Sequence, residues 1–127
     1  FGQQEPLAEY VQQANRETLV VVHIETREAV ERLPEMLDVE GIDVIFIGPT
    51  DLSHSFGAPG QPQHPDVQAA MGRIADVVAK SDKALGIMVQ NAEGARQWRE
   101  RGAQYITVNL EAVLAPAAKA YLGAARN

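Results

Sequence analysis

Four short apolar runs, rich in β-branched residues, most constrain the fold of this chain. They span residues 19–24, 44–47, 84–89 and 105–109. Their apolar content is nearly continuous, which is typical of strands buried on both faces of a parallel sheet. Helical patterns are expected at residues 5–15, 26–37, 65–80, 91–101 and 112–125. This alternation predicts an α/β fold with parallel strands and right-handed helical crossovers.

Two architectures have this order of elements. One is a small doubly wound sheet, and the other is half of a (β/α)8 barrel, for which about 250 residues are typical. The chain has 127 residues and begins with Phe1 instead of methionine. We therefore interpret residues 1–127 as a single partial domain of a longer chain, and we favour the half barrel.

The charge and the cysteine count exclude several function classes. The chain has 11 Lys and Arg residues against 17 Asp and Glu residues, and the basic residues are dispersed. Nucleic acids and anionic membranes are therefore not expected partners, because both require clustered positive charge. The absence of cysteine excludes disulfides, thiolate nucleophiles and Cys-ligated zinc. No apolar run approaches the length of a membrane-spanning helix, and a cytoplasmic location is expected.

Two acidic residues occupy the same place after consecutive predicted strands. Glu25 directly follows the run 19–24, and Asp51 comes shortly after the run 44–47. Adjacent parallel strands lie about 4.8 Å apart, so both carboxylates could reach one point at the carboxyl edge, where α/β folds bind ligands. Two carboxylates favour a hard cation such as Mg²⁺ or Mn²⁺. The alternative is that Asp51 caps a turn and Glu25 starts a helix.

The residues around these acids are further candidates. Gly48 permits a close backbone approach, and the amides that follow Pro49 and Thr50 could point at an anion. His23 lies two residues before Glu25, so both belong to the same face of a regular strand. His23 could be a metal ligand, a hydrogen-bond donor to a substrate or a satisfied interior histidine.

The segment from 48 to 64 is predicted to be a long irregular loop, and such a loop is more often functional than idle. His64, before Pro65, is interpreted as a helix-entry residue. Met88, near the end of the third run, could line an apolar pocket or fill the core.

Three segments together resemble the HpcH/HpaI aldolase family. They are HIETREAV at 23–30, VEGIDVIFIGPTDLS at 39–53 and QHPDV at 63–67. The combination of IET with GPTDLS at this spacing is specific, and the resemblance runs from about Asn15 to the C-terminus. The family comprises metal-dependent class II aldolases, carbon–carbon lyases that cleave 4-hydroxy-2-oxo acids to pyruvate and an aldehyde.

The resemblance implies a barrel of the pyruvate/phosphoenolpyruvate type, of which this chain supplies the C-terminal half, the last four β/α units. It implies that Glu25 and Asp51 bind a divalent cation, Mg²⁺, Mn²⁺ or Co²⁺, which stabilises the pyruvate enolate. The amides of Thr50 and Asp51 match the segment that holds the pyruvate carboxylate. The implied substrate-binding residues are His23, Gly48, Pro49, Thr50, Asp51, Met88 and Leu110.

The chain also departs from the family pattern at one position, and the resemblance implies how the protein assembles. Residue 23 is usually glutamine in close relatives, whereas this chain has histidine. Met88 and Leu110 match positions on the aldehyde side of the pocket. The histidine and arginine that assist proton transfer belong to the first half of the barrel, so no general base is assigned here. Family members are oligomers, commonly hexamers in which the last helix packs on a neighbouring subunit, and a homo-oligomer is therefore expected.

Three alternatives remain open. Acyl-CoA lyases of the citrate-lyase β and malyl-CoA type share the fold and the paired carboxylates. A second possibility is an isolated, catalytically inert half barrel whose exposed strand edges must be covered by another chain. A receiver-like doubly wound domain is the poorest alternative, because no acidic pair ends an initial strand.

Overall fold

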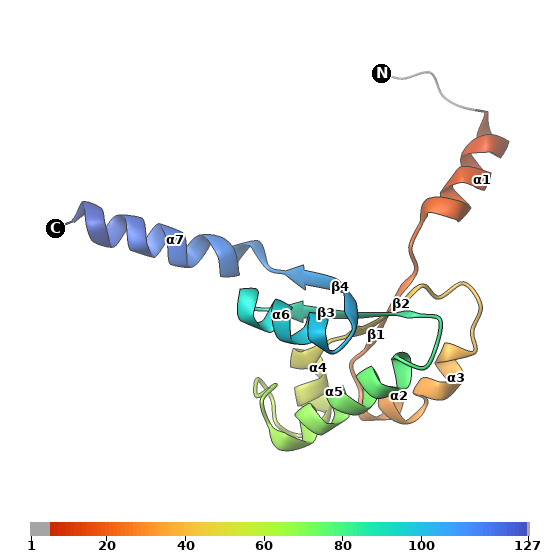
Figure 1. Cartoon of the computed structure of the whole chain (residues 1–127), viewed down its shortest axis with the longest axis horizontal. Helices are drawn as coiled ribbons and strands as arrows, with labels where there is room; N and C mark the ends of the chain where they lie inside the picture. The colour runs from red at the N-terminus through yellow and green to blue at the C-terminus, as the bar shows by residue number, and fades with distance from the viewer. Residues whose placement is uncertain (1–5, 127) are drawn as a thin grey trace.

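A computed structural model describes residues 6–126 (Figure 1). The strands are β1 (Val21–Ile24), β2 (Val44–Ile47), β3 (Ala84–Val89) and β4 (Ala103–Val108). The helices are α1 (Leu7–Glu17), α2 (Arg27–Glu31), α3 (Leu33–Leu37), α4 (Pro49–Ser55), α5 (Pro65–Val78), α6 (Ala92–Glu100) and α7 (Leu110–Ala125). The α/β alternation that the sequence predicts is therefore confirmed.

The four strands form one parallel sheet whose spatial order, β1-β2-β3-β4, follows the chain. A doubly wound sheet would reverse its strand order at a switch point and carry helices on both faces. Here α2, α3, α4 and α5 lie on one side of the sheet (Figure 1). The sequential order and the single helical layer are features of a barrel segment, so the doubly wound alternative is wrong.

The hydrophobic core lies between the sheet and this helical layer. Strand residues two apart, such as Ile45 and Ile47, face the helices and are buried. Helix α5 contributes to the same core a buried stripe at helical spacing that includes Val67, Ile74 and Val78. Burying one such side chain stabilises the fold by about 1.5–3 kcal/mol. The core therefore fixes the helical face of the sheet, whereas the opposite, open face has no such helical layer, although Val44 and Phe46 on it are also buried.

Several helix ends follow the signals in the sequence. His64 is the N-cap of α5, and its Nδ1 atom accepts a hydrogen bond from the amide of Asp66 at 3.3 Å, which confirms its helix-entry role. Gly102 follows α6 with a φ of +92°, a left-handed conformation that favours glycine. Pro34 is the second residue of α3, where a missing amide hydrogen costs little.

The prediction of an irregular loop from 48 to 64 is wrong for its first part. Residues 49–55 form α4, with Pro49 at the first helical position. Leu52 anchors this helix in the core, and the Ser53 hydroxyl donates to the carbonyl of Thr50 at 2.6 Å. A helix of seven residues with one large apolar anchor has too short a pattern for periodicity to reveal.

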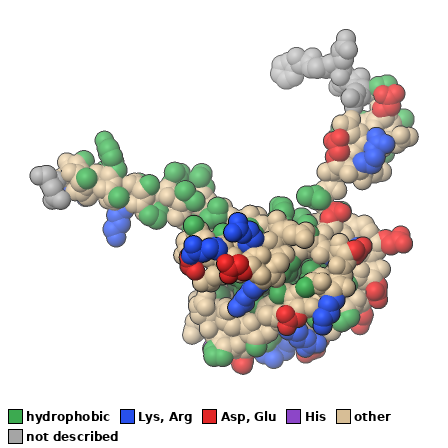
Figure 2. All heavy atoms as spheres, viewed as in Figure 1, with side chains coloured by type: hydrophobic (Ala, Val, Ile, Leu, Met, Phe, Trp, Pro, Cys, Tyr) green, Lys and Arg blue, Asp and Glu red, His purple; other side chains and the backbone are tan. Residues whose placement is uncertain are grey.

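Helices α1 and α7 project away from the body in different directions (Figure 1). Figure 2 shows hydrophobic side chains along α7, and those of Leu110, Val113, Leu114, Tyr121 and Leu122 are exposed. Within residues 6–126, no helix combines the length and the apolar character that crossing a membrane would need.

Candidate functional site

Glu25 lies against Gly48 at the carboxyl edge of the sheet. The register pairs Ile24 with Ile47, so the residues that follow these strands are neighbours. A Cβ atom added to Gly48 would lie 2.6 Å from the Cγ and 2.7 Å from the Oε1 of Glu25. Gly48 has a φ of −98°, so space and not backbone conformation requires glycine here. The close neighbour of Gly48 in the structure is the Glu25 side chain, and the predicted approach of an anion to this backbone stays a prediction.

Asp51 lies in the first turn of α4, for which Gly48 is the N-cap. The contact between Glu25 and Gly48 therefore brings Glu25 to the end of the helix that carries Asp51. Asp51 is exposed, and its carboxylate has no ion pair or hydrogen bond to any residue in 6–126. The helix dipole favours a carboxylate in this first turn, but no side chain caps α4, so the alternative that Asp51 caps a turn is not what the structure shows.

Glu25 does not start the next helix. Thr26 is the N-cap of α2, and its hydroxyl accepts from the amide of Ala29 at 3.1 Å. Glu25 precedes this cap, and its side chain is 39% exposed. Its carboxylate is therefore available to a ligand.

His23 contacts Glu25 directly. The Nδ1 atom of His23 lies 2.9 Å from Oε1 of Glu25, as expected for two residues on one face of a strand. The His23 side chain is 50% exposed. The three roles considered for His23, metal ligand, hydrogen-bond donor to a substrate and satisfied interior histidine, stay predictions.

An aromatic row on the open face of the sheet supports this pair and escaped the sequence analysis. The ring of His23 stacks on Phe46 with centroids 4.6 Å apart, and Phe46 meets Tyr105 edge-on at 6.0 Å. Phe46 and Tyr105 each pair in register with Gly86 on the strand between them. With the strand bounds of the structure, His23, Phe46, Gly86 and Tyr105 are each the third residue of their strand, a regularity that the predicted bounds at residues 19 and 105 hid.

Of the remaining predicted residues, Pro49 and Thr50 directly precede Asp51 in α4, whereas Met88 and Leu110 belong to other elements. Pro49, Thr50 and Met88 line a cavity of about 320 Å³ that extends over α6 to Trp98, whereas neither Glu25, Asp51 nor His23 lines it. Leu110 is the first residue of α7 and is 70% exposed. It follows β4, whereas Glu25 follows β1, at the opposite edge of the sheet.

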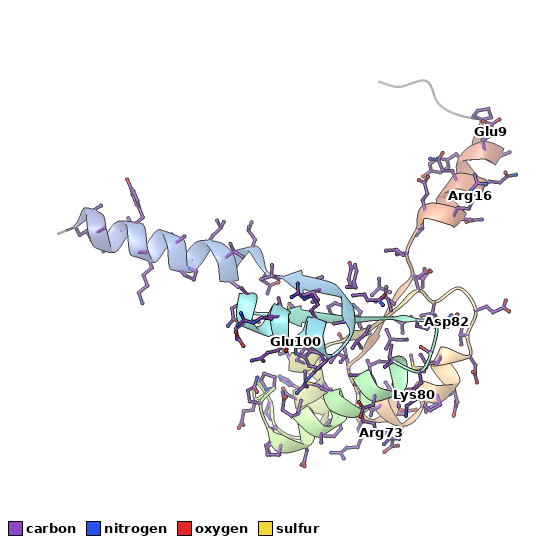
Figure 3. The ribbon with its side chains drawn as sticks, in the orientation of Figure 1. Glu9, Arg16, Arg73, Lys80, Asp82 and Glu100 are labelled. Carbon is purple, nitrogen blue, oxygen red and sulfur yellow. The ribbon has the colours of Figure 1, made fainter. Side chains whose placement is uncertain are left out.

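The charged side chains that Figure 3 labels lie away from this site. Glu9 and Arg16 belong to α1, and Arg73 belongs to α5. Lys80 and Asp82 come just before β3 and therefore lie at the amino end of the sheet. At the carboxyl edge near β1 and β2, Glu25 and Asp51 are accompanied by Arg27, the first residue of α2, whose guanidinium lies over the ring of Phe56.

The donor set at this edge fits a hard divalent cation with few protein ligands. Across residues 6–126, no three His, Asp or Glu side chains gather closely enough to hold a metal ion by themselves. Mg²⁺ commonly binds one or two carboxylates and keeps water or substrate oxygens as its other ligands. Two exposed carboxylates next to the open face of the sheet match that requirement.

Comparison with known sequences gives consistent matches. The family model described as HpcH/HpaI aldolase/citrate lyase matches residues 3–117. A 4-hydroxy-2-oxo-heptane-1,7-dioate aldolase from Escherichia coli is 45% identical over 108 residues, 85% of this chain and 41% of the relative. The enzyme of the same name from Klebsiella pneumoniae is 44% identical over 106 residues, 84% of this chain and 40% of the relative. The chain thus spans about two fifths of the length of these curated relatives.

Solved structures agree with this result. An HpcH/HpaI aldolase/citrate lyase family protein from Burkholderia cenocepacia superposes with a TM-score of 0.86 at 32% identity, covering 94% of this chain and 47% of that one. The citrate synthase SbnG gives a TM-score of 0.82 at 26% identity, over 98% of this chain and 51% of that one.

Proposed function

This chain belongs to the HpcH/HpaI aldolase/citrate lyase family, and on that premise we propose that the whole protein is a metal-dependent aldolase. The proposed reaction is cleavage of a 4-hydroxy-2-oxo acid to pyruvate and an aldehyde. The curated relatives are named as 4-hydroxy-2-oxo-heptane-1,7-dioate aldolases. That name supports 4-hydroxy-2-oxo acids as the proposed substrate class.

In this proposal Glu25 and Asp51 hold the cation, Mg²⁺, Mn²⁺ or Co²⁺. When bound, the cation supplies Lewis-acid stabilisation of the enolate that forms as the carbon–carbon bond breaks. The contact of Glu25 with Gly48, the N-cap of the helix that carries Asp51, is the observation that carries the assignment. It supports the proposal because Glu25 follows β1 and Asp51 follows β2, two neighbouring parallel strands.

The other residues bind and orient the substrate. The amides of Thr50 and Asp51 lie in the first turn of α4, where backbone N–H groups have no intrahelical acceptor. We assign to them the pyruvate carboxylate, with Gly48 and Pro49 shaping this turn. Met88 and Leu110 are assigned to the aldehyde side, and Leu110 has to be covered by another part of the assembly. The general base is expected outside this chain.

The direct test is cleavage of a 4-hydroxy-2-oxo acid by the whole protein and its Glu25→Ala variant, in buffer saturated with Mg²⁺ or Mn²⁺. We expect the variant to lose activity because one of two cation ligands is gone. Gly72→Ala is a matched control, since open space surrounds that position on α5. Near-normal activity of Glu25→Ala would refute the assignment.

A second candidate is an acyl-CoA lyase of the citrate-lyase β and malyl-CoA type. The family description that matches this chain includes citrate lyase, and that is the observation in its favour. The same paired carboxylates would serve it. Assaying malyl-CoA beside the 4-hydroxy-2-oxo acid separates the two candidates.

We further propose that the chain forms the last four β/α units of its barrel and works in a homo-oligomer, which the family resemblance makes a hexamer. Strands β1 and β4 end the described sheet, and unpaired strand edges require cover. The exposed apolar side chains of α7 also need a partner surface. Intact mass and sedimentation velocity test this proposal. If the isolated chain associates but shows no activity, the result favours the alternative of an inert half barrel.

A further inference from the structure

The hydrogen bond between His23 and Glu25 joins two side chains that are each held by a second contact. An exposed ion pair or hydrogen bond usually contributes little, because both side chains lose freedom when they meet. Here each partner is fixed from a second direction. Gly48 leaves just enough room for the Glu25 side chain, and the imidazole of His23 lies flat on Phe46 with an interplanar angle of 25°.

The aromatic row fixes Phe46 in turn. Phe46 is 7% exposed, and Tyr105 meets its ring at an interplanar angle of 73°. A Cβ atom at Gly86 would lie 2.7 Å from Cδ2 of Phe46 and 3.3 Å from Cδ1 of Tyr105. The rings of Phe46 and Tyr105 therefore occupy the space that a side chain at residue 86 would take.

The chemistry of the pair defines the direction of its hydrogen bond. An ionised carboxylate only accepts, so Nδ1 of His23 carries the hydrogen and donates to Oε1 of Glu25. The Nε2 atom of His23 makes no hydrogen bond within the described part of the chain. A hydrogen bond of this kind holds a metal-binding carboxylate in one orientation, and removing such a partner typically weakens metal binding about 10–100-fold.

We infer that His23 is a positioning residue for Glu25, and that the row of Phe46, Gly86 and Tyr105 orients its ring. This inference rests on the proposed function, in which Glu25 binds the cation. Glutamine could donate a similar hydrogen bond through its amide, but it has no ring to stack on Phe46.

The test is the Mn²⁺ affinity of the whole protein, measured by electron paramagnetic resonance from the signal of free Mn²⁺. His23→Phe keeps an aromatic ring over Phe46 but removes the donor, so its Kd is expected to rise about 10-fold or more. His23→Gln restores a donor and is expected to recover most of that loss. A residue that only stabilises the fold would change the unfolding temperature without this pattern in Kd.

Gly86→Ala tests the aromatic row without touching His23 or Glu25. It displaces the Phe46 ring and is expected to raise the Kd for Mn²⁺ several-fold, whereas Gly72→Ala leaves the Kd unchanged. Thermal unfolding of each variant confirms that binding is measured on folded protein, and Gly86→Ala replaces His23→Phe if the latter does not fold.

The outcomes separate this inference from the function on which it rests. If Glu25→Gln loses Mn²⁺ binding but both His23→Phe and Gly86→Ala bind Mn²⁺ with wild-type affinity, the positioning role of His23 is overturned. The proposed function is not affected by that result. Absence of Mn²⁺ binding by the unsubstituted protein refutes the proposed function and the positioning role together.

Discussion

Replacing Gly48 by alanine is expected to damage the cation site while leaving the fold intact. The new Cβ atom would lie 2.6 Å from Cγ of Glu25, and ordinary contact begins at 3.4 Å, so the glutamate must retreat by about 0.8 Å. A misplacement of about 1 Å at a reacting centre can cost roughly 100-fold in rate. We therefore expect kcat/KM for aldol cleavage to fall about 100-fold, with a higher Kd for Mn²⁺.

The stability of this variant should change little. Gly48 has a φ of −98°, which alanine adopts without strain, and the Glu25 side chain is 39% exposed and can swing toward water. The free energy of unfolding, from urea titration, should therefore fall by less than about 1 kcal/mol, below the 1–3 kcal/mol typical of overpacked cores. Gly72→Ala is the control. Wild-type kcat/KM and Mn²⁺ affinity in Gly48→Ala would refute the reasoning.

Three further substitutions test the fold and the site. Ile47→Ala removes a fully buried side chain from the core and should lower the free energy of unfolding by about 2–5 kcal/mol in urea titration; a loss below 1 kcal/mol would contradict the assigned core. Asn91→Ala removes the side-chain acceptor for the amide of Gly94, 2.9 Å away at the start of α6, and should lower the free energy of unfolding by about 1 kcal/mol in the same titration; an unchanged value would contradict the cap. Asp51→Asn keeps the size of the side chain but removes its charge, so Mn²⁺ binding should be lost by electron paramagnetic resonance while circular dichroism stays unchanged. Undiminished binding would remove Asp51 from the site.

The strands that are covered most completely were the easiest to predict. Residues 44–47 and 84–89 match β2 and β3 at both ends, because both strands lie inside the sheet and their residues are nearly all apolar. The bounds of the edge strands β1 and β4 were predicted less accurately. Leu19 and Val20 are apolar but exposed and precede β1, whereas β4 begins at Ala103, before the polar Gln104.

The position of the acids was predictable, but the support around them was not. Glu25 and Asp51 follow from the rule that parallel strands end at a common edge. The row of His23, Phe46 and Tyr105 depends on register across the sheet, which no single strand reveals. The assumed starts at residues 19 and 105 also hid that each member is the third residue of its strand.

The most direct test of the central claim is whether the whole protein, with Mg²⁺ or Mn²⁺, catalyses exchange of the methyl protons of pyruvate with deuterium. Nuclear magnetic resonance of pyruvate monitors the exchange. Exchange requires enolisation, the half-reaction that an aldolase of this kind must perform. We predict exchange that EDTA abolishes, that added cation restores and that Glu25→Ala eliminates. Exchange that persists in EDTA or in Glu25→Ala, or no exchange at all with cation present, would contradict a cation site built on Glu25 and Asp51.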